Sequence, residues 1–507
     1  MLAKVFSGAT IGLEGILIEV EVDVAEKGLP ILTIVGLPSK AVDEAKERVR
    51  TAIVNAGFKM PDSRTTVNMA PADIPKEGSA FDLPIAIGIL AASGMIEKNI
   101  LSESLFLGEL SLEGNLRPVP GAISIAIMAK NKKIKNLFIP QDNGMEVGLV
   151  EDINIYPALG LTDIALHLNG EKYLKAQPTT TVCKENFDEA KFEFDFREIK
   201  GQQQAKRALE IAAAGGHNLH LKGPPGAGKT MLSKAFISIL PPLEKEEILE
   251  VLKIYSIVGL LNKQKNFISR PFRAPHHTCS RIGLIGGGNK PLPGEISLAH
   301  RGVLFLDEFS EFPRSVLEAL RQPLEDGEVT ISRAAGSLTF PSRFILLAAS
   351  NPCPCGFLGH PKKKCHCLPG SILKYKKRIS GPVLDRIDLH IDVPPVEEEK
   401  LLSQINSESS STIRKRVIAA RQKQKNRFIN EPIKTNGEMH PQEIKKFCRL
   451  TKKSVDLLKQ AISRLSLSAR SYFKLIKISQ TIADLNNDEK ITASYIAEAI
   501  QYRANED

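Results

Sequence analysis

The sequence has no hydrophobic run long enough to span a membrane. A transmembrane helix needs roughly 18–20 consecutive apolar residues, and the longest candidate, 83–96, is shorter and is interrupted by Pro84, Gly88 and Gly94. The N-terminus also lacks a basic segment leading into a long apolar stretch, and Glu14 interrupts it, so no signal peptide is indicated. We therefore expect a cytoplasmic protein that does not associate with membranes.

Cysteine is scarce and tryptophan is absent. The chain has seven cysteines, no tryptophan and 6% aromatic residues in a length of 507 residues. An odd number of cysteines in a cytoplasmic protein argues against a disulfide framework. With 42% apolar and 25% charged residues, the composition excludes disorder of the whole chain. The length suggests about three domains of ordinary size, and the sequence contains no internal repeat.

Acidic residues are in deficit over most of the chain but not at its start. Residues 1–175 hold 17 Lys and Arg against 22 Asp and Glu, whereas the remaining residues hold 51 against 36, and the net charge is +10. A basic surplus of this kind suits a polyanion such as nucleic acid, although many basic proteins bind none. We expect residues 1–175 to form an acidic accessory domain and the rest of the chain to bind the polyanion.

Sequence patterns divide the chain into segments. Strand-like and helical patterns alternate through residues 1–170 and predict an α+β or α/β unit, with an amphipathic helix over 41–56. A polar, proline-containing stretch at 177–184 predicts a linker. A second domain begins near Asp195, and beyond a weak boundary at Pro394 the chain is helical and very basic.

Residues 223–230, GPPGAGKT, fit the motif G-x-x-x-x-G-K-[ST] in full. The apolar run 217–221 precedes the motif and the helical pattern 231–239 follows it, as a phosphate-binding loop requires. Glycines let backbone N–H groups turn toward phosphates, and the following helix N-terminus adds partial positive charge. We expect Lys229 to reach the β and γ phosphates of ATP and Thr230 to bind Mg²⁺. The expected nucleotide-binding residues are Gly223, Pro224, Pro225, Gly226, Ala227, Gly228, Lys229 and Thr230.

Polar side chains follow two further apolar runs. Asp307 and Glu308 come directly after the run 303–306, which is typical of a buried parallel strand. Open α/β sheets bind ligands at this end of their strands, so we expect Asp307 to hold Mg²⁺ through water and Glu308 to polarise the attacking water. The alternative is that the two acidic residues only mark the exposed end of a strand. A third run, 344–350, ends at Asn351, whose amide can orient the water and sense the γ phosphate.

Three stretches of the sequence resemble the magnesium-chelatase-like AAA+ family that includes YifB and ComM. They are DFREIKGQ (195–202) running to AAAGGHN (212–218), PFRAPHHT (271–278), and PGEISLAH (293–300) running into Asp307 and Glu308. The likeness extends over essentially the whole chain. It implies an α/β fold, with a P-loop AAA+ core, an N-terminal α+β domain of the Lon-protease or ribosomal S5-like kind, and a C-terminal helical lid.

The resemblance assigns domains and an activity. It implies a non-proteolytic N-terminal domain at 1–175, a linker at 176–190, an ATPase core at 191–395 and a helical lid at 396–507. ComM proteins are similar to hexameric, ring-shaped DNA helicases that drive branch migration when incoming single strands recombine during natural transformation. The resemblance therefore implies ATP and Mg²⁺ as cofactors, and single-stranded and branched DNA, recombination proteins and further copies of the chain as partners.

The resemblance also gives roles to three polar residues. Asn351 resembles the sensor-1 residue, which lies at the end of a central strand. Arg386 resembles the arginine finger that completes the neighbouring subunit's site, with Arg378 as the second candidate. A structural ion pair between Arg386 and Asp385 or Asp388 is the alternative. Arg470 resembles the sensor-2 arginine, which would contact the γ phosphate of its own subunit.

The N-terminal domain departs from the Lon pattern at the residues that matter for proteolysis. The segment 75–79 resembles the Lon stretch with the nucleophilic serine, but the nucleophile's place is Ala80 and Ser79 stands one position away. The place of the Lon lysine is Ile123. A serine nucleophile needs a base beside it, so we expect a scaffold or a DNA-gripping cap without peptidase activity.

Four of the seven cysteines are clustered. Cys353, Cys355, Cys365 and Cys367 form two Cys-x-Cys pairs that are nine residues apart. Four thiolates near one another suit a structural Zn²⁺ ion, although Cys-x-Cys is tighter than the usual spacing. His360 and His366 are spare ligands. Reduced surface thiols are the alternative.

Two loops of the core are candidates for DNA contact. The runs 328–333 and 337–340 predict a hairpin with Arg333 at its tip. A glycine-containing insertion at 254–298 carries Arg281 and Lys290. Loops with few aromatic residues favour contact with the DNA backbone over base stacking. The alternative for both loops is packing between subunits.

The motifs, the basic charge and the family resemblance together favour one function over three rivals. We expect an ATP-dependent hexameric DNA motor, a helicase that promotes branch migration. The first rival is a magnesium-chelatase-like ATPase that remodels a protein complex without acting on DNA. A Lon-like peptidase is disfavoured by the missing dyad, and a scaffold that binds ATP without turnover is disfavoured by the full set of catalytic residues.

Overall fold

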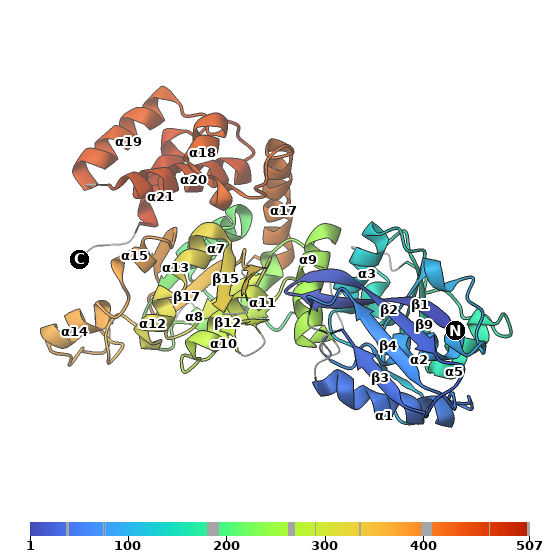
Figure 1. Ribbon diagram of the computed structural model, residues 1–507. Helices are drawn as coiled ribbons and strands as arrows, with labels where there is room; N and C mark the ends of the chain where they lie inside the picture. Colours follow the sequence, from blue (N-terminus) through green and yellow to red (C-terminus); the bar gives the residue numbers. More distant parts are fainter. Residues whose placement is uncertain are drawn as a thin grey trace. The chain divides into compact units, whose positions relative to one another are not determined.

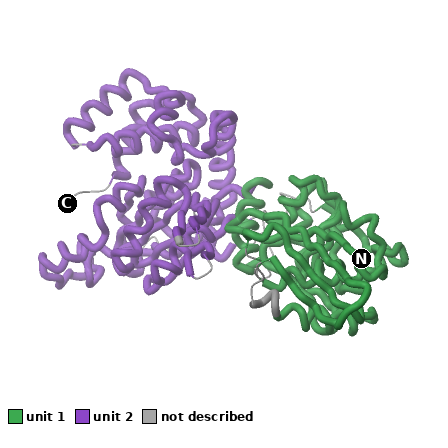
Figure 2. The backbone as a smooth tube through the Cα atoms, viewed as in Figure 1, with its two compact units in different colours: residues 1–183, 245–267 green, residues 184–244, 268–507 purple. Residues whose placement is uncertain are grey.

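The computed structural model describes residues 1–36, 40–74, 76, 78–179, 192–261, 269–288, 291–333, 336–396, 408–465 and 467–503 (Figure 1). The chain divides into two compact units (Figure 2). Unit 1 comprises Met1–Cys183 and Lys245–Phe267, and unit 2 comprises Lys184–Glu244 and Ile268–Asp507. Most of the expected linker, 176–190, lies outside the described residues.

Unit 1 is built around a seven-stranded mixed sheet with the order β3-β4-β2-β1-β5-β8-β9. Its strands are β1 (Leu2–Ile11), β2 (Glu14–Val24), β3 (Leu32–Val35), β4 (Thr65–Ala70), β5 (Ser104–Phe106), β8 (Asn136–Pro140) and β9 (Asn154–Ala158). The long pair β1–β2 is antiparallel, and β5, β8 and β9 run parallel to β1. The sequence of β2 alternates apolar and polar residues, and every second residue from Ile18 to Val22 is buried.

Helices surround this sheet. They are α1 (Lys40–Asn55), α2 (Asp82–Ala92), α3 (Ala122–Asn131), α4 (Gly144–Val147) and α5 (Leu161–Leu168), and a short ribbon pairs β6 (Glu109–Leu110) with β7 (Leu116–Arg117). Every residue of α2 is buried, Asp82 included. The helix packs against β1 and β2, and its apolar residues belong to the hydrophobic core of unit 1.

One helix of unit 1 comes from far along the chain. Helix α9 (Lys245–Val258) packs against α3, and Ser256 accepts hydrogen bonds from the backbone N–H of Gly121. Lys253 lies 3.5 Å from Glu14 at the β1–β2 turn. A segment whose sequence neighbours belong to the other unit therefore completes the fold of unit 1.

Unit 2 contains a five-stranded parallel sheet with the order β11-β14-β17-β10-β18. The strands are β10 (Leu219–Lys222), β11 (Phe272–Arg273), β14 (Val303–Leu306), β17 (Ile345–Ser350) and β18 (Leu389–Asp392). All residues of β14 and β17 are buried, as their apolar sequences predict. Because all five strands run in one direction, their carboxyl ends meet at one edge of the sheet.

Helices α7 (Gln203–Gly215) and α8 (Lys229–Ala235) share a core with one face of this sheet. Short elements fill the remaining connections of the core. These are η3 (Phe196–Glu198), η4 (Phe236–Ile239), α10 (Arg281–Ile285), α11 (Glu295–Leu298), η6 (Phe309–Glu311), α12 (Arg314–Glu318), α13 (Arg321–Asp326), α14 (Pro369–Lys376), α15 (Gly381–Leu384) and the ribbon of β12 (Gly286–Gly287) with β13 (Leu292–Pro293).

The C-terminal part of unit 2 is helical, as the sequence predicts. Its elements are α17 (Ser410–Arg427), η7 (Asn436–Glu438), α18 (Pro441–Phe447), α19 (Lys452–Leu465), α20 (Ala469–Leu485) and α21 (Ala493–Gln501). Helices α17 and α20 pack on α7, where Arg421 and Gln424 donate hydrogen bonds to the carbonyls of Ala213 and Ala214. The helical part therefore shares the hydrophobic core of the sheet.

The predicted hairpin at 328–340 is confirmed. Strand β15 (Glu328–Arg333) pairs antiparallel with β16 (Gly336–Pro341), with Arg333 opposite Gly336. Within the described part of the chain, no helix combines the length and apolar composition needed to cross a membrane.

Candidate active site

The loop between β10 and α8 has a backbone that requires its glycines. Gly226 and Gly228 have φ angles of 78° and 86°, in the left-handed region that favours glycine. At Gly223 a β-carbon would lie 2.2 Å from the carbonyl oxygen of Val393, just beyond β18. Gly226 and Gly228 are therefore needed for their backbone conformation, and Gly223 is needed because the backbone of Val393 lies so close to it.

Lys229 is the first residue of α8, directly after this loop. Its ammonium nitrogen donates to the carbonyl oxygens of Gly223 at 2.5 Å and Pro224 at 2.9 Å, and to Oδ1 of Asn351 at 3.1 Å. Burial lowers the pKa of Lys229, and the charges of Asp307 and Glu308 act in the opposite direction. The predicted lysine and the predicted sensor residue, 122 residues apart in sequence, are thus joined directly.

Thr230 and Asp307 also meet at this edge of the sheet. The Thr230 hydroxyl donates a hydrogen bond of 2.7 Å to Oδ2 of Asp307, and the other carboxylate oxygen accepts from the backbone N–H of Glu308 at 2.9 Å. Hydroxyl and carboxylate oxygens are the protein ligands that Mg²⁺ prefers beside phosphate oxygens. The side chains at this point therefore fit a magnesium ion.

Glu308 has an unusual backbone conformation. Its φ of 50° places a non-glycine residue in the left-handed region, between β14 and η6. One carboxylate oxygen lies 3.2 Å from Nδ1 of His277, whose ring also packs edge-on against Phe312. No sequence signal gave a role to His277, although it belongs to the PFRAPHHT stretch.

Arg386 and Arg470 meet on a shared carboxylate. Glu325, in α13, lies 2.6 Å from Arg386, just after α15, and 2.7 Å from Arg470, in the first turn of α20. Within the described residues, neither arginine has a hydrogen bond or ion pair with residues 223–230, Asp307 or Glu308. Arg386 thus forms an ion pair with Glu325, which is distant in sequence, and not, in the part of the chain that the structure describes, with the neighbouring aspartates.

The second finger candidate, Arg378, and the nearby aspartate Asp388 have partners other than Arg386. Arg378, the second finger candidate, forms an ion pair of 2.5 Å with Glu311. Asp388 is paired with the buried His217 at 3.3 Å. The Arg378 pair is exposed, whereas the His217–Asp388 pair is largely buried.

The four clustered cysteines converge. The sulfur of Cys353 lies 3.4 Å from that of Cys355 and 3.7 Å from that of Cys365, while Cys355 and Cys365 are 3.6 Å apart. Together with Cys367, these sulfur atoms all lie within 4.8 Å of one another. A disulfide bond is only about 2.05 Å long, so these are free thiols in an arrangement that can hold a metal ion.

The spare metal ligand predicted at His360 is used elsewhere. Its Nδ1 accepts hydrogen bonds of 3.0 Å from the backbone N–H groups of Lys362 and Lys363, and the neighbouring His366 is exposed. The cluster thus presents sulfur atoms alone.

The predicted DNA contacts are only partly within the described structure. Arg333 ends β15 at the hairpin tip, but its side chain is outside the described part. Arg281 is exposed at the start of α10, whereas Lys290 lies outside the described residues.

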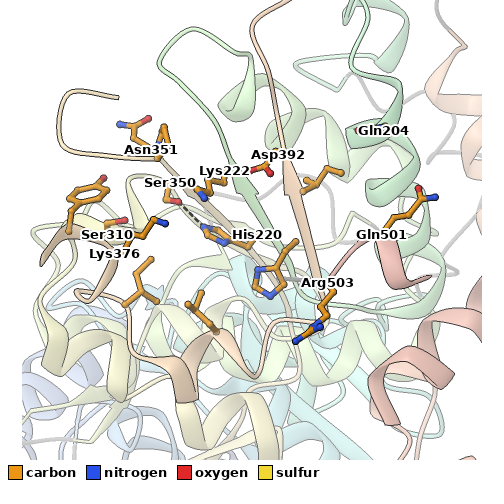
Figure 3. Close-up of a pocket in the computed structure, with 16 residues that line it drawn as sticks. Gln204, His220, Lys222, Ser310, Ser350, Asn351, Lys376, Asp392, Gln501 and Arg503 are labelled. Atoms are coloured by element: carbon orange, nitrogen blue, oxygen red, sulfur yellow. Dashed lines mark hydrogen bonds between the residues drawn. The ribbon is translucent and has the colours of Figure 1, made fainter. Parts of the chain in front are cut away.

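A cavity of about 270 Å³ is lined by Asn351 and by polar side chains of β10, β17 and β18 (Figure 3). In it, Nε2 of His220 lies 2.8 Å from the hydroxyl of Ser350. Burial lowers the pKa of His220 to about 3 and that of His390 to about 4, so both rings are neutral at physiological pH. No sequence signal marked these histidines, which alternate with core residues along short strands.

Among the described residues, the serine nearest the Lon nucleophile's place has no lysine partner. The Ser79 hydroxyl donates to the Glu109 carboxylate, while the Lys76 ammonium donates to the carbonyl oxygen of Pro71. Ser79 is therefore hydrogen-bonded to a carboxylate, and the nearby lysine is hydrogen-bonded to a backbone carbonyl.

Comparison with known proteins assigns the chain to a family. Residues 195–401 match the family model for magnesium chelatase, subunit ChlI, residues 20–143 match that for subunit ChlI of Mg-chelatase, and residues 407–503 match that for the ChlI C-terminal part. Competence protein ComM of Haemophilus influenzae is 46% identical over 507 residues, which cover 99% of this chain and 97% of that protein. The chain belongs to the ComM/YifB family.

Other relatives show how far the likeness extends. The uncharacterized protein YifB of Escherichia coli is 44% identical over 507 residues, with the same coverage of both chains. The magnesium-chelatase subunit ChlI of Euglena gracilis is 25% identical over 185 residues, 31% of this chain and 53% of that protein. ComM/YifB proteins are thus similar throughout, and chelatase subunits over part of the length. The resemblance inferred from sequence motifs is confirmed, as is the relation to a family of magnesium-chelatase-like AAA+ ATPases.

Proposed function

We propose that this protein is an ATP-hydrolysing DNA motor that works as a hexameric ring and promotes branch migration during homologous recombination, as in natural transformation. The observation that carries the ATPase half is the joining of Lys229, Asn351, Thr230 and Asp307 at one edge of a parallel sheet. The DNA half rests on the full-length similarity to a competence protein and on the basic surplus after residue 175.

The active-site residues divide the work of phosphoryl transfer. Mg²⁺ would supply charge neutralisation on the β and γ phosphates when ATP is bound. Lys229 and the loop N–H groups would bind these phosphates, and Thr230 and Asp307 would hold the metal. Glu308 would take up a proton from the attacking water, which Asn351 would orient.

We assign both arginines to the neighbouring subunit's nucleotide. Arg386 and Arg470 share Glu325 and have no bond to the phosphate loop of their own chain within the described residues. An arginine finger acts on charge that develops in a partner's site. Arg470 would therefore act beside Arg386, whereas the family resemblance implied contact with the γ phosphate of its own subunit.

The hairpin β15–β16 and the segment around α10 are the proposed DNA-contacting elements, with Arg333, Arg281 and Lys290 as the cations. Such contacts would bind phosphates, with little preference for base sequence. Single strands and branched junctions are the proposed substrates and recombination proteins the proposed partners, in the cytoplasm. The acidic 1–175 part is the proposed non-proteolytic accessory domain.

We propose Zn²⁺ as a further cofactor, held by Cys353, Cys355, Cys365 and Cys367. Zinc–thiolate bonds of about 2.3 Å in a tetrahedron separate the sulfurs by roughly 3.8 Å. The three sulfur separations of 3.4–3.7 Å are close to that value, and an all-sulfur donor set suits zinc.

The second candidate function is remodelling of a protein complex without DNA activity. The matches to magnesium-chelatase subunits favour it, because they cover the ATPase part of the chain. It uses the same active site, so only the dependence on DNA separates the two functions.

The deciding experiment measures ATP turnover by the purified protein without DNA and with single-stranded, duplex and branched DNA. Glu308→Gln serves as the blank. Turnover stimulated by DNA, and most by branched or single-stranded DNA, would support the motor and lead to a branch-migration assay. Turnover unaffected by every DNA would reject it in favour of the remodelling ATPase.

A further inference from the structure

The cysteine cluster belongs to a segment that touches the active site at two places. Asn351, which accepts a hydrogen bond from Lys229, is two residues before Cys353 in the chain. Gly356 follows Cys355 and lies against Pro225 of the phosphate loop. The position of the segment thus affects both the sensor residue and the loop that binds phosphates.

The contact at Gly356 is too close for a side chain. A β-carbon at this position would lie 2.6 Å from Cδ and 2.8 Å from Cγ of Pro225, and 3.9 Å from the side-chain carbon of Asn351. A hydrogen bond of 2.9 Å from the N–H of Gly356 to the carbonyl of Cys353 closes this turn. Backbone of the cysteine segment therefore packs directly on the proline ring.

Regular secondary structure does not hold this segment in place. Residues 352–368 contain neither helix nor strand, yet Cys353 is fully buried and the four sulfur atoms converge. Ordering so long an irregular segment has a substantial entropic cost. A metal ion that crosslinks both ends of the segment would supply the missing restraint.

We infer that the metal-bound cysteine segment is a clamp on the active site, which fixes Gly356 against Pro225 and Asn351 against Lys229. ATP turnover then depends on the occupancy of the cysteine site, although no cysteine contacts the nucleotide. This inference rests on the proposed ATPase and on the proposed zinc site, and it adds a positioning role for the metal.

Two glycines in the segment allow a matched test. Gly356 and Gly359 have φ angles of 80° and 77°, so alanine is strained to a similar degree at both. A β-carbon at Gly359 meets nothing within 4 Å, whereas at Gly356 it collides with Pro225. Gly356→Ala therefore disturbs the contact with the phosphate loop, and Gly359→Ala controls for backbone strain.

Both variants retain all four cysteines, so we expect each to keep one zinc ion per chain by elemental analysis. We expect kcat for ATP to fall about tenfold or more in Gly356→Ala, since small displacements of catalytic groups are costly, and to stay within about twofold of the parent in Gly359→Ala. Equal turnover of the two variants would overturn the clamp.

Metal removal tests directly whether ATP turnover depends on the metal at the cysteine site. A zinc-selective chelator, with Mg²⁺ in excess, should lower kcat at unchanged secondary structure, and added Zn²⁺ should restore it. Cys365→Ser should lose zinc and turnover together, whereas Cys448→Ala, outside the cluster, should retain both.

The readouts separate the three proposals. A parent protein that binds zinc but does not hydrolyse ATP contradicts the ATPase proposal. A parent protein that hydrolyses ATP and contains no bound metal contradicts the zinc site. A zinc-containing ATPase whose kcat is unaffected by chelation contradicts the clamp.

Discussion

The phosphate-loop edge and the arginine pair serve the same reaction in the proposed function, but the chain assembles them differently. Lys229, Thr230, Asp307 and Asn351 hydrogen-bond among themselves at the carboxyl ends of neighbouring parallel strands. Arg386 and Arg470 instead share Glu325, with no bond to that edge within the described residues. This difference fits the proposal that one chain forms the phosphate and metal site while its arginines serve a neighbouring subunit's site.

The largest expected effect sharpens this comparison directly. Arg386→Ala should reduce ATP turnover by about 10³–10⁵, the range of arginine-finger losses, and Lys229→Ala should also inactivate the chain. Mixing the two inactive proteins should restore measurable turnover, because some sites then combine an intact lysine with an intact neighbouring arginine. Steady-state ATPase assays of the mixtures check this.

Two controls decide how the mixing experiment is read. Lys229→Ala mixed with a Lys229→Ala, Arg386→Ala double variant should recover nothing, since no chain then has an intact lysine. Absence of recovery in the first mixture, under conditions where the parent subunits exchange, would show that both residues serve the same chain.

Glu308→Gln probes the phosphate-loop edge alone. The amide cannot accept the proton of the attacking water, so turnover should fall by about 10²–10⁴. ATP affinity should change little, because Lys229 and Thr230 stay in place. Fluorescent-nucleotide binding measured beside turnover checks the prediction. A large loss of affinity would mean that Glu308, with its neighbour His277, helps hold the nucleotide.

Arg333→Ala tests the hairpin, which belongs to neither half of the comparison. Loss of one phosphate contact should reduce DNA stimulation several-fold and lower the salt dependence of DNA binding by about one counterion. Basal turnover without DNA should be unaffected. Arg314→Ala, an exposed arginine of α12, is the charge-matched control, and equal effects of the two substitutions would contradict a specific role for the hairpin.

The smallest expected effect lies in unit 1 and concerns stability only. Burial raises the pKa of Glu146 from its usual 4.5 to about 7, although its carboxylate accepts a hydrogen bond from Asn143. The folded state therefore binds a proton more tightly than the unfolded state, and stability falls as pH rises from about 4.5 to 7. Above pH 7 the ionised carboxylate lowers stability.

Glu146→Gln should accordingly raise the melting temperature of unit 1 at pH 8, by about 2–4 °C per kcal/mol gained, and have little effect at pH 4. Turnover should be unchanged at both pH values. Thermal unfolding at the two pH values checks this. A melting temperature that shifts equally at both would rule out proton binding as the cause.

Most of the phosphate-loop edge could be predicted from sequence, because its signals are local. The motif at 223–230 encodes positive φ angles and a helix start, and each polar residue follows an apolar strand. Because neighbouring parallel strands have their carboxyl ends at the same edge of the sheet, these polar residues come together irrespective of the loops that connect the strands. The cysteine cluster was predictable for a similar reason, since its members lie within fifteen consecutive residues.

The tertiary structure decided the contacts between elements distant in sequence. Glu325 has no motif, yet it joins Arg386 to Arg470, 84 residues further on, because α13, α15 and α20 meet in one unit. Packing likewise placed His277 at Glu308, Gly356 on Pro225, and α9 in unit 1. Sequence patterns determined which residues could bind ATP, since backbone conformation and strand ends are local properties. Which charges and loops surround them depends on long-range packing, which no local pattern records.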